Sequence, residues 1–234
     1  TRTATFQINQ TSPIPLGDLA LWLNPDTSVT INESNLVEFW GDLSGGGFDA
    51  IQTGRDFRPE RVLVSGRNWI RFANTSKGMT IDPDLSIDGD YTAFVVYRGY
   101  GSPNGGNNTL FQSSDIGWFV GPYSDDHGFY NGSDWISSSN TRPTQDVVYI
   151  STAAQNESRS DYYLNGRNET HNRYSRRSPG RLALGSSGNR PGQQNYDVGE
   201  ILVYERRLSE AERSQVESYL ADRWGAELRY DPPL

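Results

Sequence analysis

Short apolar segments, separated by turn residues, recur along most of the chain and constrain its fold more than any other feature. Within each segment, large apolar side chains alternate with polar ones or form a brief continuous run, which is typical of β-strands. The chain also contains 6 Trp, 13 Tyr and 9 Phe, residues that favour strands over a helical bundle. Such a series predicts an all-β protein with two packed antiparallel sheets or a barrel. We predict eleven or more strands, at residues 19–23, 36–40, 69–73, 91–98, 108–114, 116–123, 128–132, 147–154, 161–167, 181–187 and 198–206.

One amphipathic helix is expected near the C-terminus, over residues 209–225. Ser209 can accept a hydrogen bond from the backbone of Glu212, whose carboxylate can reach back, and this reciprocal pair is a capping box. Gly225 supplies a stop signal. The apolar side chains expected to pack on the sheets fall on one face at helical spacing: Val216, Tyr219, Leu220 and Trp224.

The length of 234 residues fits one domain, because all-β domains of this size occur undivided. We expect this domain at residues 18–225, with an N-terminal extension or edge strand at residues 1–17 and a tail at residues 226–234. No apolar run is long enough to span a membrane.

The net charge of −8 and the pI near 4.8 argue against binding of nucleic acid through a broad basic face. The chain contains no cysteine, which excludes disulfides, thiolate metal sites and cysteine nucleophiles.

Asn-x-Ser/Thr sequons are more frequent than the composition predicts, since about three are expected by chance. One interpretation is that Asn, Ser and Thr all concentrate in turns, and the other is a glycosylated protein of the cell exterior or a virion surface. The seven candidate glycosylation sites are Asn9, Asn32, Asn74, Asn107, Asn131, Asn156 and Asn168.

The order of several motifs resembles a known family. The front half carries "VEFWGDLSGGGFDAIQ", "RPERV", "WIRFA" and "YTAFVVYRG", and the back half carries "DYYLNGR", "LALGSS" and "VGEILVYERRLSEAERSQVESYLADRWG". This series is similar to the concanavalin A-like, laminin G-like jelly-roll domains of secreted and surface proteins. The resemblance covers about residues 18–225 and implies an antiparallel two-sheet β-sandwich. It also implies that the glycine-rich turn after Trp40, with Asp42 as its cap, is structural.

We expect no enzymatic activity. Glycosidases that share this architecture carry closely spaced acids on one strand, in the pattern Glu-x-Asp-x-x-Glu, and that pattern is absent. The nearest candidates, Glu200 and Glu205, are separated by an odd offset and so point to opposite faces of a strand. His127 and His171 lie near no nucleophile motif.

Calcium is a possible cofactor, since laminin G-like domains often hold it at a sheet rim. Hard oxygen ligands suit calcium, although the spacing does not fit a helix-flanked calcium loop. The alternative is that these acids are solvated turn residues. The candidate ligands are Asp82, Asp84, Asp88 and Asp90, with Asp125 and Asp126 as a second locus.

The segment "GWFVGPYSDDHGFYNGSDW" mixes aromatic side chains with carboxylates and an amide. Sugars are held by aromatic faces and by planar polar groups, so this mixture predicts a shallow glycan site. The alternative is that at least half of the aromatics fill the core, and we expect Trp118 inside and Trp135 exposed. The candidate ligand-binding residues are Trp118, Tyr123, Asp125, Asp126, Tyr130, Asn131 and Trp135.

Two noncatalytic functions remain. The first is an extracellular recognition or adhesion module, with glycans or surface proteins as partners and carbohydrate as the expected ligand class. The second is a structural subunit of an exterior assembly, such as a surface filament, a cell-surface layer, or a viral fibre or capsid decoration. Residues 3–8 alternate like a strand and could pair with a neighbouring subunit, although an edge strand of the same chain or a linker fits equally.

Overall fold

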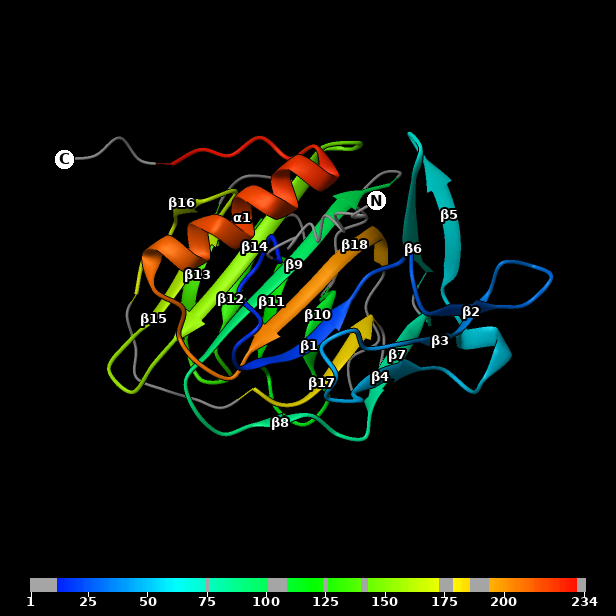
Figure 1. Cartoon of the computed structure of the whole chain (residues 1–234), viewed down its shortest axis with the longest axis horizontal. Helices are drawn as coiled ribbons and strands as arrows, with labels where there is room; N and C mark the ends of the chain where they lie inside the picture. The colour runs from blue at the N-terminus through cyan, green and yellow to red at the C-terminus, as the bar shows by residue number, and fades with distance from the viewer. Residues whose placement is uncertain are drawn as a thin grey trace, which may run out of the picture.

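The computed structural model describes residues 12–74, 76–100, 109–123, 126–139, 143–172, 179–185 and 194–230. Within these residues, two antiparallel sheets pack face to face and one helix lies across the outer face of one of them (Figure 1). The predicted β-sandwich with a C-terminal helix is confirmed.

The eight-stranded sheet contains most of the long strands. Every strand of this sheet except β5 overlaps a predicted strand. Its order is β16 (Arg167–Asn168), β15 (Ser160–Leu164), β14 (Val148–Gln155), β9 (Tyr91–Gly99), β18 (Gln194–Tyr204), β6 (Arg67–Asn74) and β5 (Glu60–Val64), and β1 (Leu19–Leu23) also pairs with β18.

The ten-stranded sheet contains many short strands, and most of those that the sequence did not predict are two to five residues long and lie here. Its order is β13 (Trp135–Ser139), β12 (Asp126–Tyr130), β11 (Phe119–Tyr123), β10 (Phe111–Ser113), β17 (Gly180–Gly185), β7 (Gly78–Asp82), β4 (Asp49–Ile51), β3 (Val37–Trp40) and β2 (Val29–Ile31), and β8 (Ser86–Ile87) also pairs with β17. A single 3-10 turn, η1 (Arg55–Phe57), joins β4 to β5 in the described chain.

Strand β9 is buried on both faces, which explains its continuous apolar sequence. Val95 and Tyr97 face the core between the two sheets. Phe94 and Val96 face a second core, between the eight-stranded sheet and the helix. The molecule therefore has three layers and two apolar cores.

Helix α1 (Glu210–Trp224) begins and ends as the sequence predicts. Ser209 and Glu212 form the capping box, and Gly225 ends the helix with φ of 76°. Val216 and Trp224 are fully packed against the sheet. Ile14, before β1, is buried in the same second core.

A β-bulge in β18 brings a buried carboxylate into this second core. The register between β18 and β9 shifts between Val198 and Ile201, and Glu200 lies within the shift with no solvent exposure. Its Oε1 accepts from the indole Nε1 of Trp22 at 2.6 Å, and its Oε2 accepts from the indole Nε1 of Trp224 at 2.8 Å. The carboxylate therefore ties α1 to β1 and β18.

The glycine-rich turn after β3 is structural, as predicted. The Asp42 carboxylate accepts backbone N–H bonds from Trp22 at 2.9 Å, Ser44 at 2.8 Å and Gly47 at 3.0 Å. The turn is thereby fixed to β1 by its own aspartate.

No helix in the described part of the chain is both long enough and apolar enough to cross a bilayer.

Candidate functional site

Three strands at one edge of the ten-stranded sheet, β11, β12 and β13, carry aromatic side chains on their outer face. Phe119 on β11 is the cross-strand partner of Tyr130 on β12, and Tyr130 is the partner of Trp135 on β13. Tyr123 lies four residues after Phe119 and therefore shares this face. We call these four residues the aromatic cluster.

The rings of the aromatic cluster contact one another closely. Phe119 stacks on Tyr123 with centroids 4.8 Å apart, and Trp135 meets the edges of Tyr123 at 5.0 Å and Tyr130 at 5.5 Å. Phe119 is 2% exposed, whereas Trp135 is 36% exposed. Phe119 is thus the floor of the cluster, and the other three rings form its accessible surface.

The turn between β12 and β13 fixes the position of Trp135. The side-chain oxygen of Asn131 accepts the backbone N–H of Ser133 at 3.0 Å and that of Asp134 at 2.9 Å. The Tyr130 hydroxyl donates to the Ser133 carbonyl at 3.0 Å. These bonds hold the exposed indole next to the tyrosine without any contribution from a ligand.

Two predicted ligand residues do not belong to this surface. Trp118 is fully buried between the sheets, where its Nε1 donates to the Tyr91 hydroxyl at 2.7 Å. Asn131 is fully buried in its turn. Both are removed from the ligand set, because alternation turns Trp118 inward and the turn occupies the Asn131 oxygen. Asp126 is half-buried opposite Tyr123, and Asp125 lies outside the described residues.

The predicted calcium ligands are not gathered into a site. The described residues contain no group of three or more acidic or histidine side chains arranged to hold a metal. Asp82 pairs across strands with Asp49, and Asp84 forms an ion pair with Arg181 at 3.1 Å. Asp88 directly follows β8, and Asp90 directly precedes β9.

The sequons are turn motifs wherever the structure describes their side chains. Asn32, Asn131, Asn156 and Asn168 each accept the backbone N–H of the Ser or Thr two residues later. This bond defines an Asx turn, which selects the same residue types as a sequon. Asn9, Asn107 and the side chain of Asn74 lie outside the described residues.

Neither histidine is placed for chemistry. His127 has no solvent exposure, and its Nδ1 shares a hydrogen bond with the hydroxyl of Tyr97. Burial lowers the pKa of His127 to about 3, so the ring is neutral at physiological pH. His171 is exposed beside β13, where its backbone N–H donates to the carbonyl of Ile136 at 3.0 Å.

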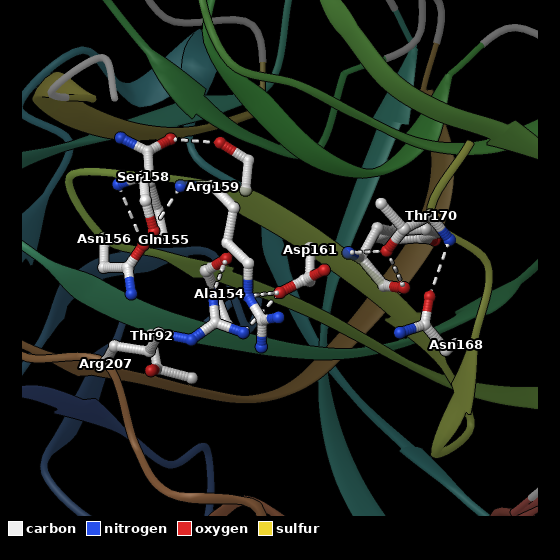
Figure 2. Close-up of polar contacts among 12 residues, drawn as sticks. Thr92, Ala154, Gln155, Asn156, Ser158, Arg159, Asp161, Asn168, Thr170 and Arg207 are labelled. Atoms are coloured by element: carbon white, nitrogen blue, oxygen red, sulfur yellow. Dashed lines mark hydrogen bonds and ion pairs between the residues drawn. The ribbon is translucent and has the colours of Figure 1, made fainter. Parts of the chain in front are cut away.

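A groove that the sequence did not reveal lies between β14, β15 and the start of α1. It has a volume of about 730 Å³, and its wall includes Arg159, Arg207 and Arg213. Figure 2 shows the guanidinium groups of Arg159 and Arg207 converging on the carboxylate of Asp161. Arg159 lies far in sequence from Arg207 and Arg213, and the three form no motif, so only the fold reveals that they lie together.

No protein-family model and no curated protein matches the sequence. Solved structures do match, among them Trypanosoma rangeli sialidase in complex with sialic acid, with a TM-score of 0.63 and 14% identity over 91% of this chain and 34% of that one. The binding domain of Paraclostridial Mosquitocidal Protein 1 gives a TM-score of 0.61 and 19% identity over 93% of this chain and 57% of that one. The receptor binding domain of botulinum neurotoxin C/D mosaic serotype gives a TM-score of 0.63 and 12% identity over 93% of this chain and 56% of that one.

In each case the chain spans less than two thirds of the matched structure. Identities this low show a shared β-sandwich fold and nothing about the activity of the whole proteins.

Proposed function

We propose that this protein is a noncatalytic recognition module that binds carbohydrate outside the cell. The observation that carries this proposal is the outward-facing aromatic cluster, in which Trp135 is 36% exposed and rests on buried Phe119. Exposed large aromatic side chains supported by a rigid sheet are typical of binding surfaces rather than of inert ones.

The chemistry of the cluster suits a sugar. Aromatic rings present a flat apolar surface to the C–H groups of a pyranose, and polar groups at the rim can bond its hydroxyls. Asp126 and Asp134, both half-buried, lie at the ends of the strands that carry the rings. The resulting site is shallow, so a single sugar should bind weakly and repeated contacts should add affinity.

Two of the matched structures support a binding role for this fold, since they are described as binding domains. The match to the sialidase does not favour catalysis here, because it covers about a third of that chain. Of the acids considered from the sequence, Glu200 accepts from two indoles and from the Tyr219 hydroxyl at 3.0 Å. A carboxylate enclosed in this way is structural and has no access to a substrate.

The test compares Trp135→Ala with two matched variants on a glycan array and in thermal melts. We expect Trp135→Ala to lose glycan binding with little change in melting temperature, because the indole is partly exposed. Phe57→Ala removes another exposed aromatic side chain, on η1, and should keep binding. Trp118→Ala removes a core side chain and should cost about 3 to 5 kcal/mol of stability.

Two results would contradict the proposal. If the wild type binds no glycan, or if Trp135→Ala binds as the wild type does, the aromatic cluster is not a sugar site. The structural-subunit function would then be the better one.

A further inference from the structure

We propose that the arginine-lined groove between β14, β15 and α1 is a second binding site, for an acidic sugar held by its carboxylate. The site stands on its own residues and does not depend on the aromatic cluster, which lies on the other sheet. A volume of about 730 Å³ is within the range of small-ligand sites, roughly 300 to 1,000 Å³.

The charge arrangement in the groove leaves capacity for an anion. Asp161 Oδ2 forms an ion pair with Nε of Arg159 at 2.9 Å and accepts a hydrogen bond from Nη2 of Arg207, so one carboxylate is shared by two guanidinium groups (Figure 2). Arg213 is paired separately with Glu217. This gathering of arginines runs against the net charge of the chain, which is −8.

Two of the arginines are held rigidly. Arg207 is mostly buried, and its Nη1 donates to the carbonyl of Ala154 at 2.9 Å. Arg213 is buried and stacks 3.8 Å above the ring of Tyr163. Rigid cations lose little conformational entropy when a ligand arrives, so they favour binding.

Arg159 is the group best placed to contact the ligand. Its side chain is 45% exposed, and its Nε lies 2.9 Å from Oδ2 of Asp161. Within the described residues, its two terminal nitrogens donate no hydrogen bond to the protein. A guanidinium with both terminal nitrogens available matches the two oxygens of a carboxylate, and such bidentate bonds are stronger than neutral ones.

The remaining walls suit the hydroxylated body of a sugar rather than an apolar acid. Asn168 contributes an amide, Ser214 and Ser218 contribute hydroxyls, and Tyr230 contributes a ring. Glu210 is an exposed acid at the rim and should weaken the binding of any anion. Replacing Glu210 with a neutral residue should therefore strengthen anion binding, whereas loss of Arg159 should weaken it.

The experiment titrates two acidic probes and their neutral counterparts into the protein by calorimetry or NMR. Cellobiouronic acid is compared with cellobiose, and sialyllactose with lactose. We expect at least one acid to bind about tenfold or more tightly than its neutral partner. The binding should weaken as salt rises.

Four variants locate the site. Arg159→Gln should weaken acid binding about tenfold or more, and Glu210→Gln should strengthen it. Arg181→Gln is the matched control, since this exposed arginine lies on β17 of the other sheet. Trp135→Ala should leave acid binding unchanged, which separates this site from the proposed function.

The proposal is overturned if the wild type does not distinguish either acid from its neutral partner, or if Arg159→Gln binds as tightly as the wild type. Equal competition by acetate at the same concentration would also overturn the assignment to a sugar.

Discussion

The pKa of His127 is set by its burial in the core between the sheets. Its ring lies 4.3 Å from that of Tyr149, and its hydrogen bond to Tyr97 continues through the Tyr97 hydroxyl to Ser151 at 3.0 Å. These neighbours on β9 and β14 offer no negative charge that could stabilise a protonated imidazole. The pKa of about 3 therefore has a purely environmental cause, which is burial.

This depressed pKa predicts a specific acid sensitivity. The unfolded chain binds a proton on His127 below about pH 6.5, whereas the folded chain does not until about pH 3, so stability is lost as pH falls between these values. The loss is up to about 1.4 kcal/mol per pH unit. In urea unfolding, His127→Gln should reduce the stability difference between about pH 7 and pH 4.5 by roughly 2 kcal/mol relative to the wild type. His171→Gln, on the surface, should change this difference little, and an unchanged difference in His127→Gln would contradict the assignment.

The sequence distinguished some site residues and not others for a physical reason. Trp118 begins an apolar run and Trp135 follows a turn, so alternation and turn chemistry placed one inside and the other outside correctly. Asn131 could not be assigned in this way, because an amide that closes an Asx turn and an amide that contacts a sugar are the same side chain.

Among the elements, β1, β18 and α1 meet at the buried carboxylate of Glu200. The helix itself was predictable in full, since its cap, its apolar face and its stop are local signals. The partner of Glu200 on β1, Trp22, is 178 residues away, and no local pattern connects the two. The need for a glycine at position 199 is equally invisible in the sequence. In the fold, a Cβ there would lie 2.9 Å from the Trp224 ring.

Removal of the Glu200 carboxylate should loosen the helix. Glu200→Ala would leave the buried indole N–H of Trp224 and the part-buried indole N–H of Trp22 without their acceptor, and a buried donor left unsatisfied typically costs about 1 to 3 kcal/mol. Glu205→Ala, at an exposed position five residues later, should change stability by less than about 0.5 kcal/mol. Chemical denaturation of both variants tests this. If Glu200→Ala is as stable as Glu205→Ala, the hydrogen bonds of the Glu200 carboxylate are dispensable for stability.

For the whole molecule, the sequon excess now has two sufficient causes. Asx turns account for the pattern at four asparagines, and glycosylation in an exterior compartment remains a prediction. Intact mass of protein from its native source should exceed 26.2 kDa if the prediction is right. Glycopeptides are expected at Asn32 and Asn156, which are partly accessible, and not at buried Asn131. A mass equal to that of the polypeptide alone would leave turn formation as the whole explanation of the sequon excess.

The state of association separates the two noncatalytic functions. A recognition module of this size should be a monomer in light scattering after size exclusion, because the described surface has scattered exposed apolar side chains. A polymer or a closed symmetric assembly would instead favour the structural subunit. The N-terminal segment predicted to mediate such pairing lies outside the described residues, so its deletion is the informative variant.

The bulge in β18 has a consequence for the length of that strand. Val198 and Ile201 face the same core although three positions separate them, because the bulge supplies one extra residue. If the same residues alternated strictly after Val198 without the bulge, Ile201 and Val203 would turn toward the helix, and Leu202 and Tyr204 would turn between the sheets. One extra residue in the strand thus decides which core each of these four apolar side chains enters.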